Sequence, residues 1–302
     1  MKKVLAMLGL ALAMSAQAKE VITILYAFSP SDTTGNYSRV IANELNNSQD
    51  KYTFVFDAKP GAGGTIAVNE VLNKPNNVIL HHSTAFFVRP NIFPKESWDI
   101  GAFKEQFLYC SAPLVVAGSN VRSWSEVAGK KDVTIGISGL GVTTHLMAVQ
   151  LQKKYPNLII IPFKSTTDAM ASMYSKQTDL AIGFAGEVTQ WVASGKVSVL
   201  GITGPTSHKG FPSLSSQGHD KIFDGMVVGQ HLAVPKTWSD EKTKEIYGML
   251  SKVANKQVVL DSYKDDLCVP KRLPYNGMDT WYSKQTEYWK LLSADVKIEE
   301  KK

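Results

Sequence analysis

The chain has 302 residues, and its 33 Lys and Arg against 27 Asp and Glu give a formal net charge of +6 at pH 7. The basic residues are scattered among acidic ones, which argues against a nucleic-acid-binding protein. Beyond the N-terminal segment, no run of about 18 apolar residues is long enough to cross a bilayer. A chain of this length usually folds into two lobes.

The first 18 residues have the three parts of a secretory signal peptide. Lys2 and Lys3 precede a short apolar run over 4–14, and Ser15–Ala18 ends in the small-residue pattern A-x-A. We therefore expect cleavage after Ala18, export to the periplasm, and a mature chain that starts at Lys19.

An oxidising compartment allows a disulfide between the two cysteines, Cys110 and Cys268. Two buried free thiols are the alternative, because the sequence does not give the distance between the two Cα atoms. No spacing of Cys and His residues predicts a structural metal, and adjacent residues such as His81 and His82 face opposite ways on a strand. We expect no metal and no cofactor.

In the first part of the mature chain, short apolar strands are predicted over 21–27, 54–56 and 77–81. The turn that follows the first strand is rich in hydroxyl groups and precedes a helix. Its side chains either bind a ligand at the helix N-terminus or only cap the helix; the candidates are Phe28, Ser29, Ser31, Thr33 and Thr34. The polar turn after the third strand adds Ser83 and Thr84 as candidates.

The second strand leads into a glycine turn within 59–68 and then into another helix. Pro60 ends the strand ladder, and three nearby glycines allow positive φ angles and a close approach of a ligand to the backbone. The start of the helix would attract an anion, which makes Ala62 and Gly63 candidates. A tight turn without ligand is the alternative. The spacing matches neither a P-loop nor a dinucleotide fingerprint.

A second series of strands and helices begins after two strands over 107–110 and 114–117. Its strands are predicted over 133–137, 158–162, 180–183 and 197–202, and a further strand over 226–234 precedes helices over 240–254 and 278–294. Two of its turns supply further candidates, which are Ser138, Gly139, Gly141, Val142, Thr143 and His145 in one and Phe184 and Ala185 in the other.

Alternating strands and helices predict an α/β fold with mainly parallel sheets flanked by helices. In such sheets ligands bind beyond the carboxyl ends of the strands, which is where every candidate turn lies. Two series of similar size predict two lobes with a ligand cleft between them. We assign 19–112 plus 230–302 to the first lobe and 113–229 to the second.

Five motifs in the same order resemble the tripartite tricarboxylate transporter substrate-binding family, also called the Bug family, over the whole mature chain. They begin with Pro60–Gly64 and the similar turn Ile137–Leu146, and continue with Ile161–Ser165, Ser194–Thr203 and Pro212–Leu214. The resemblance implies a type II periplasmic binding protein and no enzyme. It also implies that the protein captures a small carboxylate, delivers it to the membrane subunits of a secondary transporter, and is expected to act as a monomer.

The family resemblance further implies that backbone N–H groups and hydroxyls of the turns hold one ligand carboxylate, without a required arginine. Two departures concern this site. Val142 stands where the family has a serine, and Asp32 stands at one of the family's glycines. Asp32 would repel a carboxylate and favour an amine if it faced the cleft, but we expect it to face solvent and cap the helix.

Two other functions remain open. The protein could be a ligand sensor that feeds a membrane kinase, since the fold would be the same. A secreted serine hydrolase is the other alternative, because Gly136-Ile-Ser-Gly-Leu140 is close to the G-x-S-x-G nucleophile motif. Leu140 replaces its final glycine, and His145 is expected to cap or pack in the following helix rather than act as a base.

Overall fold

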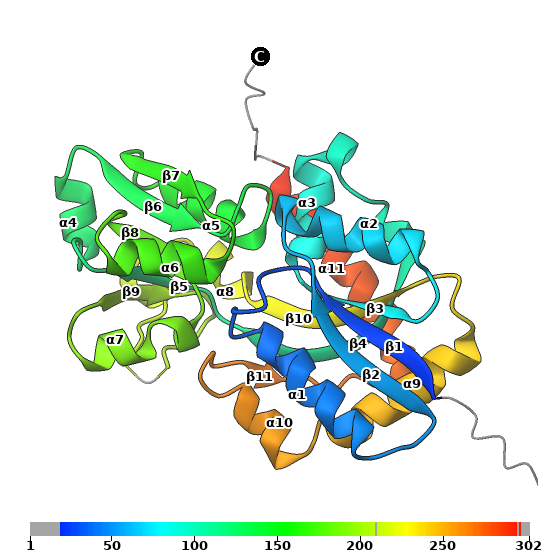
Figure 1. Cartoon of the computed structure of the whole chain (residues 1–302). Helices are drawn as coiled ribbons and strands as arrows, with labels where there is room; N and C mark the ends of the chain where they lie inside the picture. The colour runs from blue at the N-terminus through cyan, green and yellow to red at the C-terminus, as the bar shows by residue number, and fades with distance from the viewer. Residues whose placement is uncertain (1–18, 209, 295, 297–302) are drawn as a thin grey trace, which may run out of the picture.

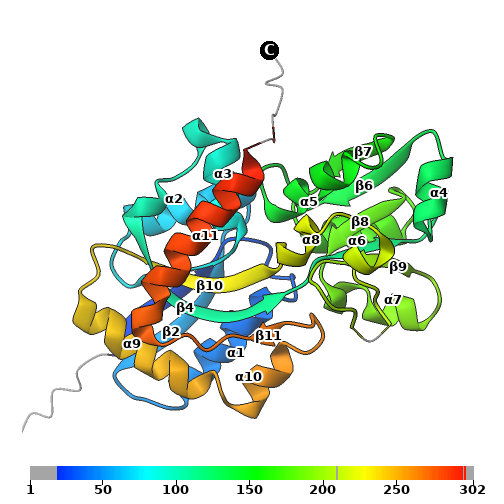
Figure 2. The same cartoon turned by 180° about the vertical axis from the view of Figure 1, so that it is seen from behind.

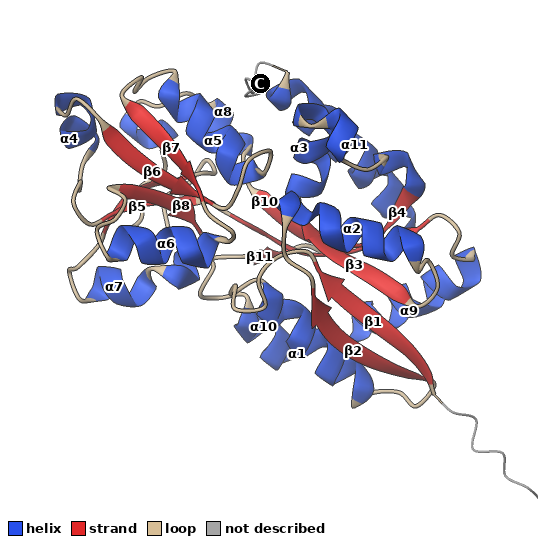
Figure 3. Cartoon of the chain, turned by 45° about the horizontal axis from the view of Figure 1, so that its top comes forward, coloured by secondary structure: helices blue, strands red, loops and turns tan. Residues whose placement is uncertain are grey.

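The computed structural model describes residues 19–208, 210–294 and 296, so the predicted signal peptide lies outside the described residues. Two α/β lobes lie side by side, each built around one sheet (Figure 1). Helices cover both faces of each sheet (Figure 3). Within the described ranges, no helix combines the length and the apolar character needed to span a bilayer.

The first lobe contains a six-stranded sheet in the order β11-β4-β10-β3-β1-β2. Its strands are β1 (Glu20–Tyr26), β2 (Tyr52–Ala58), β3 (Val78–Ser83), β4 (Phe103–Ala112), β10 (Val228–Pro235) and β11 (Val269–Pro270). Its helices are α1 (Gly35–Asn46), α2 (Thr65–Asn73), α3 (Ala85–Ile92), α9 (Asp240–Val253), α10 (Gln257–Ser262) and α11 (Met278–Ser293).

The second lobe contains a five-stranded sheet in the order β7-β6-β8-β5-β9. Its strands are β5 (Val115–Gly118), β6 (Val133–Ile137), β7 (Leu158–Pro162), β8 (Leu180–Gly183) and β9 (Ser198–Ile202). Its helices are α4 (Trp124–Gly129), α5 (Thr143–Gln152), α6 (Thr166–Tyr174) and α7 (Thr189–Ala193), and α8 (Ile222–Gly225) precedes the return to the first sheet.

The predicted α/β class with two lobes is confirmed, and each sheet also contains antiparallel pairs. β1 is parallel to β2 and β3, and β6 is parallel to β7 and β8, whereas β4, β5, β10 and β11 all pair antiparallel with their neighbours. The cause is the crossing between lobes. β4 leads out of the first lobe and β10 leads back, so the two run side by side in opposite directions (Figure 2). The exact lobe boundaries stay a prediction.

The core consists of apolar residues on the strands and on the helix faces that pack against the sheets. The buried strands β6 and β8 occupy the predicted residues, because short apolar runs fit a sheet covered on both faces. Strand β7 also occupies its predicted residues, but it is the edge strand of its sheet, and Ile159 is exposed. Helix α1 buries Tyr37, Ile41 and Leu45, which are spaced four residues apart on one face. Helix α3 was not predicted, because the sequence at its start resembles a turn and the helix contains Pro90. Burial of Phe86 and its neighbours stabilises this helix.

Cys110 and Cys268 form a disulfide, the first of the two alternatives that the sequence left open. Cys110 lies in β4, and Cys268 directly precedes the two-residue edge strand β11, in which Pro270 pairs with Cys110. The bond closes a loop with a sequence separation of 158 residues. It therefore fixes the segment before β11 to β4, the second strand of the first sheet.

We expect removal of this disulfide to destabilise the protein. A crosslink that closes a long loop limits the unfolded chain and typically contributes about 2–5 kcal/mol. The double variant Cys110→Ala/Cys268→Ala should therefore unfold at a clearly lower temperature than the oxidised protein. Treatment of the wild type with reductant should reproduce the shift, and an unchanged melting temperature in both experiments would contradict a stabilising role.

Candidate functional site

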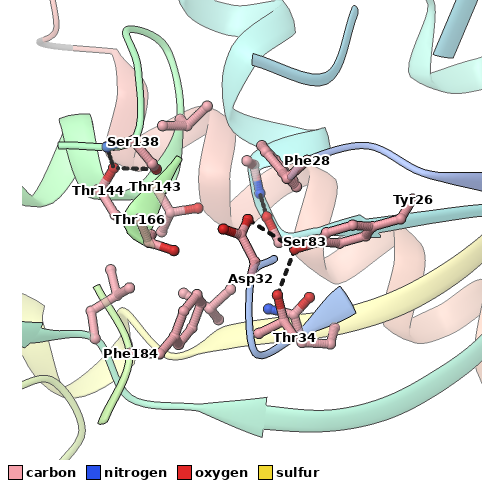
Figure 4. Close-up of a pocket in the computed structure, with 15 residues that line it drawn as sticks. Tyr26, Phe28, Asp32, Thr34, Ser83, Ser138, Thr143, Thr144, Thr166 and Phe184 are labelled. Carbon is pink, nitrogen blue, oxygen red and sulfur yellow. Dashed lines mark hydrogen bonds between the residues drawn. The ribbon is translucent and has the colours of Figure 1, made fainter. Parts of the chain in front are cut away.

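Fifteen residues from both lobes enclose a small space between them, here called the inner cavity, of about 30 Å³ (Figure 4). The carboxyl ends of β1, β3, β6 and β8 all point to it, so the turns after these strands form its walls. Seven predicted residues line it, which are Phe28, Thr34, Ser83, Ser138, Val142, Thr143 and Phe184. The other eight are Tyr26, Asp32, Ala85, Leu114, Thr144, Thr166, Val228 and Gln230.

The N-terminus of α5 presents hydrogen-bond donors to the inner cavity. Its N-cap residue, Val142, provides no side-chain cap, so the first N–H groups of the helix keep no partner within the helix. Thr143 is 3% exposed, and its Oγ1 has no hydrogen-bond partner among the described residues. Ser138 supports the turn, because its N–H donates to Thr144 Oγ1 at 3.1 Å. The partial positive charge of the helix end favours negative charge in this part of the cavity.

The first lobe places an acid on the opposite wall. Asp32 is 5% exposed, and Figure 4 shows its carboxyl group pointing into the cavity, toward the side of Thr143 and Thr166. The expectation that Asp32 faces solvent and caps the helix is wrong: α1 has no side-chain cap. The reason is a local turn, in which the Asp32 N–H donates to Ser29 O and the carbonyl of Asp32 accepts from Gly35 N–H. This turn directs the side chain inward.

Asp32 contacts the second lobe through a hydroxyl that a second acid shares. Thr167 Oγ1 lies 3.0 Å from Asp32 Oδ1 and 3.0 Å from Glu187 Oε1. A hydroxyl has one proton to donate, so it donates to one carboxylate and accepts from the other acid in its protonated form. Burial raises the pKa of Asp32 to about 7 and the pKa of Glu187 to about 8. The pair therefore retains a proton near neutral pH.

Two further hydrogen bonds join the lobes. Asp266, in the loop before β11, accepts from the backbone N–H of Gly186 at 3.1 Å across the cleft. Asp266 also accepts from Thr33 Oγ1 and Tyr37 OH within the first lobe. Arg89 in α3 donates from Nη1 to the carbonyl of Leu140 at 2.9 Å. Together with the Asp32–Thr167 contact, these bonds hold the lobes in a closed arrangement.

The glycine turn lies in an outer cleft next to the inner cavity. Ser29, Ala62, Gly63 and Gly139 line this outer cleft together with Arg89. Gly63 has a φ of +60°, and a Cβ there would lie 2.9 Å from Arg89 Nη1. The glycine therefore provides room for the arginine that bridges the lobes. The prediction that this turn binds a ligand anion remains untested, and the turn is not part of the inner wall.

The remaining predicted residues lie outside both sets of lining residues. Ser31 is exposed, and Thr84 is the buried N-cap of α3. Gly141 donates its N–H to Nδ1 of His145 at 3.2 Å, and burial lowers the pKa of His145 to about 4, so this histidine is neutral and supports the turn. Thr33 binds Asp266 as described, and Ala185 is buried in the short helical turn after β8.

Four residues of the site were not predicted from the sequence, namely Arg89, Glu187, Asp266 and Gln230. None of them belongs to a motif, and each reaches the cleft through contacts with residues far away in the sequence. Glu187 alone lies in a turn that the sequence predicts, the one that follows β8. Across the ranges that the structure covers, no group of three His, Cys, Asp or Glu side chains is placed to hold a metal ion.

Two mixed sheets, a double crossing between lobes and a polar interlobe cavity define the class of periplasmic solute-binding proteins. The model of the tripartite tricarboxylate transporter family receptor matches residues 38–301. The chain therefore belongs to this family, whose members are periplasmic solute-binding proteins and not enzymes. This membership removes the hydrolase alternative.

Individual proteins show the same relationship. A UPF0065 protein of Bordetella bronchiseptica is 25% identical over 210 residues, which cover 65% of this chain and 61% of that protein's length. The periplasmic binding protein BugD is similar in structure, with 20% identity, a TM-score of 0.80, and coverage of 90% of this chain and 96% of BugD. MatC from Rhodopseudomonas palustris with bound malate has 15% identity, a TM-score of 0.79, and coverage of 91% and 99%.

The buried acid Asp32 predicts a pH-dependent stability. Its folded pKa of about 7 lies above the ordinary value of 3.8, so the folded state binds more protons between these values. The stabilisation is present below about pH 4 and is lost as the pH rises through about 7. Asp32→Asn cannot ionise and should be more stable than wild type at pH 8, by up to about 4 kcal/mol, with a smaller difference at pH 5.

The measurement is denaturant unfolding at several pH values. Asp132→Asn, a substitution of the same kind at an exposed position of the second lobe, serves as the control for net charge. A difference between Asp32→Asn and wild type that does not grow with pH would contradict the assignment.

Proposed function

We propose that this protein captures a small organic acid in the periplasm and delivers it to the membrane subunits of a tripartite tricarboxylate-type transporter. The uncapped N-terminus of α5, with the unpartnered hydroxyl of Thr143 in the wall of the inner cavity, carries this proposal. Membership of the receptor family and the malate bound by the similar MatC support it. Export would require removal of the signal peptide, for which we propose cleavage after Ala18.

In this mechanism the second lobe binds one ligand carboxylate. The N–H groups of Thr143 and Thr144 and the hydroxyl of Thr143 donate to its oxygens, and the helix dipole adds favourable charge. No basic side chain is needed at this end. Phe28 and Phe184, which also line the cavity, would cover the apolar part of the ligand.

Closure of the lobes around the ligand is the second part of the mechanism. A space of about 30 Å³ holds roughly two water molecules, so an acid with several carbon atoms enters only after the lobes move apart. The three interlobe hydrogen bonds of Asp32, Arg89 and Asp266 then re-form as the cleft closes. The ligand shifts this equilibrium because it binds the closed form better. The closed form is the one that docks on the transporter.

A thermal-shift panel of acids and their methyl esters tests the carboxylate site. A ligand that binds only the folded state raises the melting temperature, so an acid should give a shift that its ester does not give. Thr143→Val should reduce the affinity for that acid at least about tenfold, since one charge-assisted hydrogen bond contributes about 1.5–3 kcal/mol.

Thr178→Val is the matched control for this panel. Thr178 is also buried in the second lobe with an unpartnered Oγ1, but it does not line the inner cavity. Equal losses of affinity in the two variants, or equal shifts with acid and ester, would argue against a carboxylate at α5.

Small-angle scattering tests closure. The radius of gyration of the wild type should decrease when the acid that gives the largest thermal shift is added at saturation. Thr143→Val at the same acid concentration should show a smaller decrease, because fewer molecules bind the acid. Identical scattering curves with and without a bound acid would refute the closing mechanism.

A further inference from the structure

Donors and acceptors occupy opposite walls of the inner cavity. The second lobe contributes donors, namely the N–H groups at the start of α5 and the hydroxyl of Thr143. The first lobe contributes two acceptors, the carboxyl group of Asp32 and the side-chain oxygen of Gln230 in β10. The hydroxyls of Tyr26 and Thr34 also line this wall, but they bond to each other, and Tyr26 OH lies 3.4 Å from Asp32 Oδ2. Gln230 is 1% exposed, and its Oε1 has no hydrogen-bond partner within the described ranges. A ligand that satisfies both walls therefore needs acceptors at one end and N–H or O–H donors at the other.

The one charged side chain among the cavity-lining residues lies on the acceptor side, in the first lobe. Among the fifteen lining residues, Asp32 is the one acidic side chain, and none is Lys, Arg or His. Behind Asp32 lies a second carboxyl group, that of Glu187, joined to it through Thr167. Glu187 also accepts hydrogen bonds from Thr166 Oγ1 and from the Phe184 N–H. Among the residues that the structure describes, neither acid forms an ion pair with a Lys, Arg or His side chain.

A dicarboxylate fits these walls poorly. Its first carboxylate would accept from the N–H groups of α5, but its second would lie against the acceptors Asp32 and Gln230. Two carboxylates that share a site repel each other unless one of them is protonated. A protonated amine, in contrast, donates up to three hydrogen bonds and supplies the missing positive charge.

We propose that the ligand is a zwitterion, a small amino acid whose carboxylate binds at the start of α5 and whose protonated amine binds Asp32 and Gln230. This inference rests on the proposed function, because it takes the carboxylate end from that proposal and assigns the other end. Asp32 is then the residue that determines specificity between amino acids and plain acids.

Isothermal titration of the mature protein at pH 7.5 with matched compounds tests the assignment. Each set contains an amino acid, the acid in which a methyl group replaces the ammonium group, and the dicarboxylate of the same length. Three sets cover increasing length: glycine, propionate and malonate; β-alanine, butyrate and succinate; γ-aminobutyrate, valerate and glutarate. In at least one set the amino acid should bind at least tenfold more tightly than both partners.

Two variants then separate the ends of the ligand. Asp32→Asn should reduce the ratio of the affinity for the amino acid to the affinity for the plain acid by at least tenfold. Thr143→Val should lower the affinity for the amino acid and the affinity for the plain acid by the same factor. Asp132→Asn, which changes the net charge equally at an exposed position, should change neither affinity.

The failures of the two proposals are distinguishable. Plain acids or dicarboxylates that bind the wild type as tightly as the amino acids overturn the zwitterion assignment and leave the carboxylate proposal in place. An amino-acid preference that Asp32→Asn retains overturns the role of Asp32. The absence of binding by every acid and amino acid of the three sets overturns both proposals.

Discussion

The contact between the lobes centres on two carboxyl groups, those of Asp32 and Glu187, which share one hydroxyl and have no basic partner within the described ranges. Asp32 and Glu187 both lie 3.0 Å from the single hydroxyl of Thr167, and a proton must be retained for both contacts to exist. A buried charge without a partner is costly, so the pair holds its proton or meets a cation. The turns after β1 and β8 and the start of α6 all supply polar groups that hydrogen-bond within this pair.

The sequence predicts the fold well where local patterns decide it. β6 and β8 occupy the expected residues because their apolar runs fit a covered sheet, and the turns that follow them meet at the cavity by the geometry of parallel strands. β7 occupies the expected residues as a partly exposed edge strand. The antiparallel entry of β10 was not predictable in this way. It depends on how the chain crosses between the lobes, which no local pattern records.

The candidate site was predictable only in part, for a related reason. Ser138 and Thr143 lie at a strand end and a helix start, and the sequence shows both. The direction of Asp32 depends on its contacts, and the hydroxyl that it meets belongs to Thr167, 135 residues later. Arg89 likewise reaches Leu140 in the other lobe, 51 residues later. A turn that the sequence predicts as polar can therefore present its acid to solvent or to the cleft, and tertiary packing decides between them.

The disulfide also affects the cleft, although it lies within the first lobe. Cys268 is two residues from Asp266, the acid that accepts the Gly186 N–H across the cleft. The covalent bond to β4 and the hydrogen bonds from Thr33 and Tyr37 already restrict the loop that carries Asp266. Conformational entropy of this loop is therefore lost when the protein folds, so the proposed closure of the lobes on a ligand would cost less. The disulfide within the first lobe thus preorganises Asp266, the acceptor of a hydrogen bond that joins the two lobes.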